Sequence, residues 1–290
     1  MALASQANSL PETQRSVVLC ADDFALTEGV SRGILELAEA GRISATSAMT
    51  NRPAWADLAG TLKPLAGRIG VGLHLNFTTG EPLGPLQELA PSGRFPEIKP
   101  LMRQAFAGRL PRAELRGEIE RQLDAFVGAF GSPPAFVDGH QHAHVLPVIR
   151  GELLAALGAR GWQGRVWLRD PSDRVGPILR RQVSWRKALV VGGLAFGFRR
   201  AARAAGFDTN EGFSGYSPFD LATTPERVFG QAFLALGPRP LVMCHPGYWD
   251  EGLRALDPDV ESRDFEKDYL RSEAFDRLLA ERGLRLAPRP

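Results

Sequence analysis

Short apolar runs alternate along the chain with segments whose apolar residues recur at helical spacing. The runs predict strands at Val17–Cys20, Ser44–Met49, Ile69–Asn76, Ala135–Val137, Val166–Leu168, Leu241–Cys244 and Leu284–Leu286. Amphipathic patterns between them predict helices, among them Arg112–Phe130 and Phe265–Glu281. This alternation is typical of a mostly parallel sheet, because parallel neighbours need a long crossover connection, usually a helix.

Six to eight such units in a chain of 290 residues predict an α/β fold of the (β/α) barrel-like, TIM type, either complete or incomplete. A doubly wound open sheet is the competing arrangement. We expect residues 1–15 to form a flexible N-terminus and residues 16–290 to form a single domain. The stretch from Thr78 to Pro100, rich in Gly and Pro, predicts a long loop, which is uncommon without a functional reason.

A basic segment interrupts this alternation between about residues 170 and 216. From Arg165 to Arg203 the chain has ten basic residues and two acidic ones, next to the apolar run Ala188–Phe198. That run spans 11 residues, whereas crossing a bilayer takes roughly 20. The segment predicts a basic helical insertion. It is either a solvated surface element or a peripheral contact with an anionic membrane or a lipid-linked substrate.

The overall composition excludes several classes of protein. The formal net charge is +2, so the chain lacks a global basic field and nucleic acid is not an expected partner. Cys20 and Cys244 are the two cysteines, which excludes a disulfide scaffold and favours a reducing compartment. Residues 1–15 show no signal-peptide pattern, so we expect a cytoplasmic protein, with the membrane surface as the alternative location. The oligomeric state is left open.

All five histidines and a pair of aspartates lie at or directly after the ends of predicted strands. Asp22 and Asp23 follow the first strand, while His74 and Asn76 share one face of the third. Sites in barrels and open α/β sheets form at the carboxyl ends of strands, so we expect these side chains to meet. Two adjacent carboxylates there need a cation, hydrogen bonds or solvent. Capping of the following helix is their alternative role.

Three more histidines lie in the run Asp138-Gly139-His140-Gln141-His142-Ala143-His144. An extended chain puts all three on one face, whereas a helix puts only His140 and His144 together. Grouped imidazoles suit a borderline divalent ion, with Asp138 and the remaining histidines orienting the ligand ring. His245, in the later run Cys244-His245-Pro246-Gly247-Tyr248, is a candidate general acid. A purely structural histidine cluster is the alternative.

One Asp with two His makes a three-ligand site with open positions, which is typical of a catalytic metal. Such an ion lowers the pKa of bound water toward about 7 and polarises a carbonyl, while a free carboxylate accepts the proton. These parts fit hydrolysis of an amide or ester, and they also fit a phosphoesterase. The residues therefore predict metal-assisted hydrolysis, with a catalytically silent protein that keeps the site as the alternative class.

At these residues the sequence resembles the YdjC-like family of carbohydrate deacetylases, which includes chitooligosaccharide deacetylases and hopanoid-associated proteins. The matching runs are Ala21-Asp22-Asp23-Phe24, Gly72-Leu73-His74-Leu75-Asn76, Asp138-Gly139-His140-Gln141-His142-Ala143-His144 and His245-Pro246-Gly247, with a looser match at Arg263, Glu266, Leu270 and Ser272. One departure is Ala25, where the family pattern commonly has Gly.

The resemblance implies a (β/α) barrel-like fold and metal-dependent removal of an N-acetyl group from an amino sugar, free or lipid-linked. A catalytically silent sugar-binding protein is the alternative class. It implies Asp23, His74 and His140 as metal ligands, Asp22 as the base that activates water, and His245 as the acid that protonates the amine. Zinc and magnesium are the first expectations for the ion, and manganese, cobalt, nickel and iron suit the same donors. The further candidates for substrate contact or for orienting the ligands are Asn76, Asp138, His142, His144 and Arg169.

Overall fold

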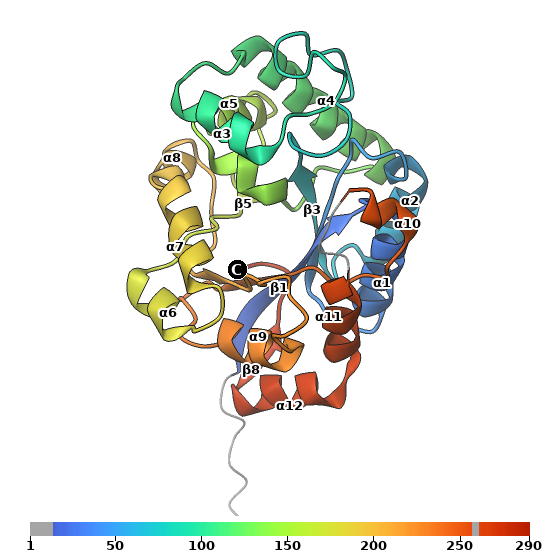
Figure 1. Ribbon diagram of the computed structural model, residues 1–290, viewed down its shortest axis with the longest axis vertical. Helices are drawn as coiled ribbons and strands as arrows, with labels where there is room; N and C mark the ends of the chain where they lie inside the picture. The colour runs from blue at the N-terminus through green and yellow to red at the C-terminus, as the bar shows by residue number, and fades with distance from the viewer. Residues whose placement is uncertain (1–13, 257–260) are drawn as a thin grey trace, which may run out of the picture.

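The computed structural model describes residues 14–256 and 261–290, which form a curled parallel sheet surrounded by helices (Figure 1). The strands are β1 Arg15–Phe24, β2 Ala45–Ala48, β3 Gly70–Leu75, β4 Phe136–Gly139, β5 Trp167–Leu168, β6 Phe213–Ser214, β7 Leu241–Cys244 and β8 Leu284–Leu286. The α-helices are α1 Glu28–Glu39, α2 Trp55–Leu62, α3 Ile98–Phe106, α4 Arg112–Phe130, α5 Ile149–Ala159, α6 Val175–Arg180, α7 Trp185–Leu194, α8 Phe198–Ala204, α9 Pro225–Ala232, α10 Glu251–Arg254, α11 Glu261–Arg271 and α12 Glu273–Glu281. Two 3₁₀ segments are η1 Lys63–Leu65 and η2 His140–Val145.

The strand order is that of a barrel. Seven parallel strands run β5-β4-β3-β2-β1-β7-β6, and β8 pairs with the start of β1. Strands β1 to β5 are neighbours in succession, β6 pairs with β7, and β7 returns to β1, as in a barrel and unlike a doubly wound sheet. The edge strand β5 meets the segment that leads into β6 through one isolated bridge, from Leu168 to Thr209. The (β/α) barrel-like fold is therefore confirmed, in its incomplete form.

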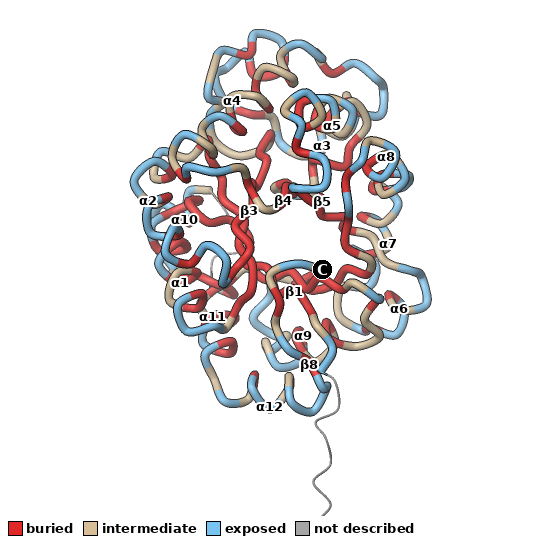
Figure 2. Tube along the Cα trace, turned by 180° about the vertical axis from the view of Figure 1, so that it is seen from behind, coloured by how far each residue is buried: buried red, intermediate tan, exposed pale blue. Residues whose placement is uncertain are grey.

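The buried residues concentrate in the strands and on the sides of the helices that cover them (Figure 2). Helix α4 shows why its amphipathic sequence pattern predicted a helix. Its stripe Leu115, Ile119, Leu123 and Phe126 is buried, and Gly131 ends the helix with a φ of +92°. Among the described residues, no helix has both the length and the apolar composition that crossing a membrane requires.

Three details differ from the sequence expectation. Helix α3 begins at Ile98, inside the stretch expected to be a loop. The expected single helix over 265–281 is two helices, because Ser272 has extended dihedrals and separates α11 from α12. The short β6 was not predicted, since two residues carry too little pattern. Residues 1–13, most of the expected flexible N-terminus, lie outside the described residues.

Candidate metal centre and pocket

Strand β1 ends in an irregularity that brings two adjacent aspartates to the same pocket. Successive residues of a regular strand point to opposite faces of the sheet. The pairing of β1 with β2 shifts register between Ala21 and Phe24, and Asp23 has a φ of +73°. This bulge redirects the chain, so Asp22 and Asp23 both line the pocket. Ala25 also has a positive φ, +69°, a conformation that favours glycine.

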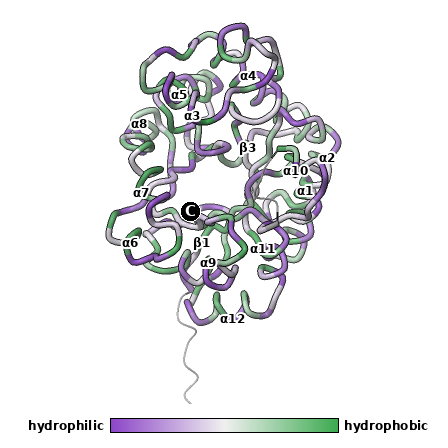
Figure 3. Tube along the Cα trace, in the orientation of Figure 1, coloured by the Kyte–Doolittle hydropathy of each residue, from purple (hydrophilic) through white to green (hydrophobic). Residues whose placement is uncertain are grey.

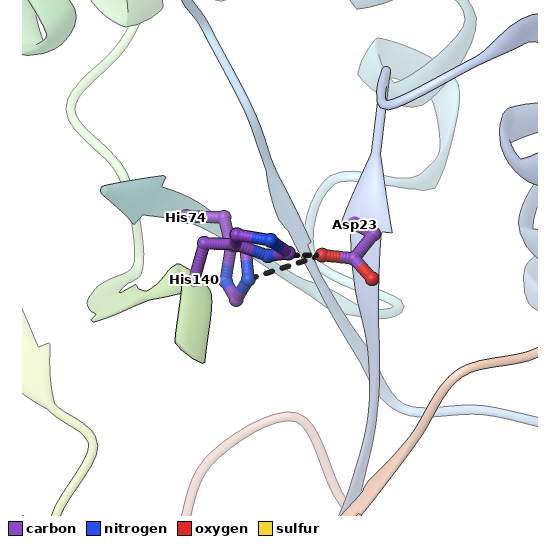
Figure 4. Close-up of side chains that lie close together, drawn as sticks. All are labelled: Asp23, His74 and His140. Atoms are coloured by element: carbon purple, nitrogen blue, oxygen red, sulfur yellow. Dashed lines mark hydrogen bonds and ion pairs between the residues drawn. The ribbon is translucent and has the colours of Figure 1, made fainter. Parts of the chain in front are cut away.

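Asp23, His74 and His140 converge from β1, β3 and the start of η2 and point toward one another (Figure 4). Asp23 Oδ1 lies 3.2 Å from His74 Nε2 and 3.0 Å from His140 Nδ1. The three donor atoms all lie within 4.8 Å of one another. Two donors that are each about 2.1 Å from one ion and roughly 100° apart lie about 3.2 Å from each other. The spacing of this donor set therefore fits a single shared divalent ion.

The other side of the His74 ring contacts Asp138. His74 Nδ1 lies 2.7 Å from Asp138 Oδ1 and 3.0 Å from Ser47 Oγ. Donation of the Nδ1 proton to the carboxylate leaves the Nε2 lone pair facing Asp23, as a metal ligand requires. Burial lowers the pKa of His74, but Asp138 and the other carboxylates outweigh it and raise the pKa to about 10. A proton and a metal ion therefore compete for this imidazole.

Arg263 contacts the second oxygen of Asp23. Its Nη2 lies 2.7 Å from Asp23 Oδ2, and both side chains are buried. Burial raises the pKa of Asp23, but Arg263 and His140 outweigh it and hold the pKa well below the usual range. Asp23 is therefore ionised, with Oδ2 bound by the guanidinium and Oδ1 directed at the imidazoles.

Arg169 binds Asp22 and Asp138 together at the end of β5. Its Nη1 and Nη2 each lie 2.6 Å from one oxygen of Asp22, and Nη2 lies 2.5 Å from Asp138 Oδ2. Burial raises the pKa of both carboxyl groups. For Asp138 the contacts with Arg169 and His74 prevail and lower it, whereas for Asp22 burial prevails and the pKa stays raised. Asp22 is thus the more basic of the two carboxylates.

A second group of donor atoms comes from Cys20, Asp22 and Asp138. Arg169 Nη2 bonds to all three residues, and its distance to Cys20 Sγ is 3.0 Å. A guanidinium at this position already supplies the positive charge, so the group is not a candidate metal site. The Asp23 cluster is the site that fits a cation.

His245 follows β7 and lines the same pocket, which has a volume of about 390 Å³. Its backbone N–H donates to Glu266 Oε2 over 2.7 Å. Burial lowers the pKa of His245 well below its usual value, so the ring is neutral at neutral pH. Burial also raises the pKa of Glu266, to about 7. The turn after His245 packs tightly on α1, because a Cβ added at Gly33 would lie 2.9 Å from Gly247 Cα.

The three histidines of η2 point in different directions, which neither sequence expectation foresaw. Gln141 and His142 have φ values of +49° and +58°, so the segment is neither extended nor regularly helical. His140 faces Asp23. His142 lines the pocket beside the rings of Phe213 and Tyr216. His144 is buried, and its Nε2 donates to the backbone oxygen of Arg169 over 2.8 Å.

The Asn76 side chain forms hydrogen bonds within the loop that follows β3. Its side-chain oxygen accepts from the backbone N–H groups of Thr78 and Thr79. Its amide donates to Asn51 Oδ1 and to the Thr79 carbonyl. The side chain is fully buried among these partners. Asn76 therefore shapes the rim of the pocket rather than lining it.

Two residues of this site, Arg263 and Glu266, had received no role from sequence reasoning. Both belong to the looser motif match, and no nearby pattern reveals which groups they bind. Apolar side chains also line the pocket, which the sequence did not indicate. They come from loops and from helices α3 and α7, and they are Leu26, Ile98, Met102, Val191, Leu194, Phe219 and Leu256.

Comparison with known proteins finds a family match over most of the chain. The family model described as YdjC-like protein matches residues 16–281. The chain is 32% identical over 277 residues to the chitooligosaccharide deacetylase of Klebsiella pneumoniae (strain 342), covering 94% of this chain and 97% of the relative. It is 33% identical over 254 residues to the carbohydrate deacetylase of Mus musculus, covering 80% and 78%. A crystal structure of a "putative cellobiose-phosphate cleavage protein" from Enterococcus faecalis V583 shares the fold, with a TM-score of 0.69 at 22% identity over 94% of this chain and 97% of that one.

Proposed function

The chain belongs to the YdjC-like protein family, and from this premise we propose that it is a metal-dependent carbohydrate deacetylase. The proposed reaction hydrolyses an N-acetyl group of an amino sugar and releases acetate and the free amine. The names of the Klebsiella and mouse relatives support a carbohydrate such as a chitooligosaccharide as the substrate. A lipid-linked glycan is the second substrate class that we propose, and these names do not bear on it. The observation that carries the metal dependence is the convergence of His74 and His140 on Asp23 Oδ1.

Asp23, His74 and His140 would hold one divalent ion, with zinc and magnesium as the first candidates. When bound, the ion would supply electrophilic activation of the acetyl carbonyl and a lower pKa for water. Asp138 orients the His74 ring through Nδ1, and Arg263 orients Asp23 through Oδ2. These two contacts would preserve the ligand geometry during turnover.

Asp22 is the proposed base. Arg169 binds both of its oxygens, yet a carboxylate offers about four lone-pair directions, so acceptor capacity remains toward the pocket. Burial raises the pKa of Asp22, which brings its basicity closer to that needed near neutral pH. Arg169 binds both oxygens of Asp22, whereas Arg263 binds only Oδ2 of Asp23 and leaves Oδ1 directed at the imidazoles, so Asp23 is the better placed of the two as a metal ligand. This division of roles supports Asp23 as the ligand and Asp22 as the base.

His245 is the proposed donor of the proton to the departing amine. Its ring is neutral before the reaction because burial lowers its pKa. Negative charge that develops on the substrate raises the proton affinity of a nearby imidazole. His245 would therefore take up a proton from solvent while Asp22 removes one from the attacking water. His245 would then pass its proton to the amine nitrogen, and Asp22 would return its proton to solvent. The bond from carbonyl carbon to nitrogen breaks as the amine takes this proton.

The test is an acetate-release assay on N-acetylated chitooligosaccharides with metal-stripped protein, before and after addition of each divalent ion. We expect negligible release by the stripped protein and recovery with at least one ion. A parallel measurement of phosphate release from sugar phosphates tests the phosphoesterase alternative. Phosphate release without acetate release, or acetate release that chelation does not affect, would contradict the proposal.

A further inference from the structure

We propose that the insertion helices α6, α7 and α8 form a docking face for an anionic lipid bilayer. This inference goes beyond the proposed reaction and does not depend on it. The three helices lie together on one side of the barrel (left in Figure 1). Figure 3 shows hydrophobic and hydrophilic stretches mixed along them.

Large apolar side chains of this face are exposed to solvent. Phe196, in the turn between α7 and α8, is 85% exposed, whereas Phe198 is fully buried. The turn is ordered, because Arg150 Nη1 donates to the Phe196 carbonyl over 2.9 Å and Gly197 takes a φ of +79°. The other exposed apolar residues of the insertion are Val175, Leu179, Trp185 and Val190. Val175 and Phe196 line one groove, and exposed apolar side chains gathered on one part of a protein are typical of an interaction surface.

The same face carries arginines whose charge is not neutralised within the described part of the chain. Arg174, Arg180, Arg186 and Arg200 are exposed, and none of them forms an ion pair with a described residue. On α7, Arg186 and Val190 are four residues apart and therefore share one face of the helix. Basic and apolar side chains thus occupy the same surface.

A groove of about 840 Å³ lies among the three helices, and both basic and apolar side chains line it. Its lining includes Arg174, Arg200, Val175, Leu189 and Phe196. The acidic groups of the lining are already bound, Asp170 by Arg199, Asp173 by Arg181 and Glu211 by Arg203. The positive charge that remains in the groove favours an anionic amphiphile.

Charge and side-chain type together favour a bilayer over a second copy of the chain. Aromatic and aliphatic residues on short helices insert at the boundary between headgroups and acyl chains, and nearby arginines attract anionic headgroups. Two copies joined through this face would bring like charges together, which opposes association.

Helix α7 connects this face to the metal site. Val191 and Leu194 line the metal pocket, whereas Leu189 and Gly193 line the groove. Docking through the insertion would therefore hold the pocket beside the membrane surface.

The test is co-sedimentation of the full chain with vesicles of phosphatidylcholine alone or containing about one third phosphatidylglycerol. We expect binding to the anionic vesicles that weakens with salt, and little binding to the neutral ones. The double variants F196S/V190S and R174Q/R200Q should each lower the partition coefficient by about tenfold or more. The matched controls are F265S, an exposed Phe on α11, and R282Q/R285Q, two exposed arginines at the end of α12 and in β8. They should bind as the wild type does.

Equal binding to both vesicle types would overturn the proposal, as would equal losses in the insertion variants and the controls. Sedimentation velocity without lipid tests whether a second copy of the chain covers this face instead. A wild-type dimer that the F196S/V190S substitutions dissociate would assign the face to that second copy and would overturn the proposal. The thermal unfolding midpoint of each variant shows whether it is folded. Because sedimentation measures no catalysis, its failure is distinguishable from failure of the proposed deacetylase activity.

Discussion

Arg169 binds Asp22 through both of its terminal nitrogens, and each nitrogen lies 2.6 Å from a different carboxylate oxygen. The contact joins the carboxyl ends of β5 and β1. Asp22 cannot turn toward the two imidazoles without losing both charge-assisted hydrogen bonds. The arrangement gives two neighbouring aspartates different surroundings: Asp23 faces His74 and His140, and Asp22, bound by Arg169, has the proposed role of base.

Replacing Asp22 with Asn should lower kcat by at least about a hundredfold, because an amide oxygen cannot take the proton from water. Metal content should stay unchanged, because the proposed ligands are Asp23, His74 and His140. The measurement is steady-state acetate release together with elemental analysis. Asp173→Asn is the matched control, since Asp173 also pairs with an arginine, Arg181, outside the pocket. An Asp22→Asn variant with wild-type kcat would refute the base assignment.

Replacing Arg169 with Ala should lower the free energy of unfolding by about 3–5 kcal/mol, because it leaves two buried carboxylates without their shared partner. Arg169→Lys restores the charge but cannot form both bonds to Asp22, so it should recover part of the stability and little of kcat. Urea unfolding and acetate release measure the two effects. An Arg169→Ala variant within about 1 kcal/mol of the wild type would contradict the role of this ion pair.

The fold was largely predictable because each strand and helix carried its own local pattern. Strand β7 was predicted with its observed bounds, Leu241–Cys244, and so was β8, Leu284–Leu286. Their placement in a barrel depends on the order of the strands in the sheet. The sequence does not give that order directly, and the barrel was predicted from the number of strand–helix units. The break at Ser272 was not predicted, because the apolar spacing continues across it from α11 into α12.

The convergence of the aspartates with the histidines was predictable because these residues come at strand ends, where parallel sheets collect polar groups. The choice of Asp23, His74 and His140 among them came from the family resemblance. The partners of these ligands were not predictable. Arg263 is 240 residues from Asp23 in the chain, and no local pattern links them. The orientation of the η2 histidines was also unpredictable, because it depends on two consecutive residues with positive φ.

Replacing Ala25 with Gly should raise the free energy of unfolding by about 1 kcal/mol. Ala25 has a φ of +69°, where its Cβ is strained and Gly is not. The larger conformational entropy of Gly in the unfolded chain offsets part of this gain. Urea unfolding at fixed pH measures the change, and Ala48→Gly, in β2, is a control expected to destabilise. A loss of stability in Ala25→Gly would show that the turn does not strain Ala25.

Glu266 should make the protein less stable as the pH rises. Its pKa is about 7 in the folded protein, raised by burial from the ordinary 4.5. Between these values the folded state binds more protons than the unfolded state, so the free energy of unfolding falls with rising pH. Glu266→Gln keeps an acceptor for the His245 N–H and removes this dependence.

As the pH rises from about 4.5 to about 7, the wild type should lose stability relative to Glu266→Gln. The free energy of unfolding of the variant minus that of the wild type should therefore increase by up to about 3 kcal/mol over this range. Urea titrations at several pH values measure it. A difference that stays constant from pH about 4.5 to about 7 would contradict the raised pKa.

The central claim is that Asp23, His74 and His140 hold one divalent ion while Asp22 does not. The direct measurement is the metal content of the wild type, Asp22→Asn, Asp23→Asn and His74→Ala after dialysis against the same buffered zinc solution, with circular dichroism to establish folding. We predict one ion per chain in the wild type and in Asp22→Asn, and none in the other two folded variants. Loss of the ion from Asp22→Asn, or its retention in Asp23→Asn and His74→Ala, would contradict the account.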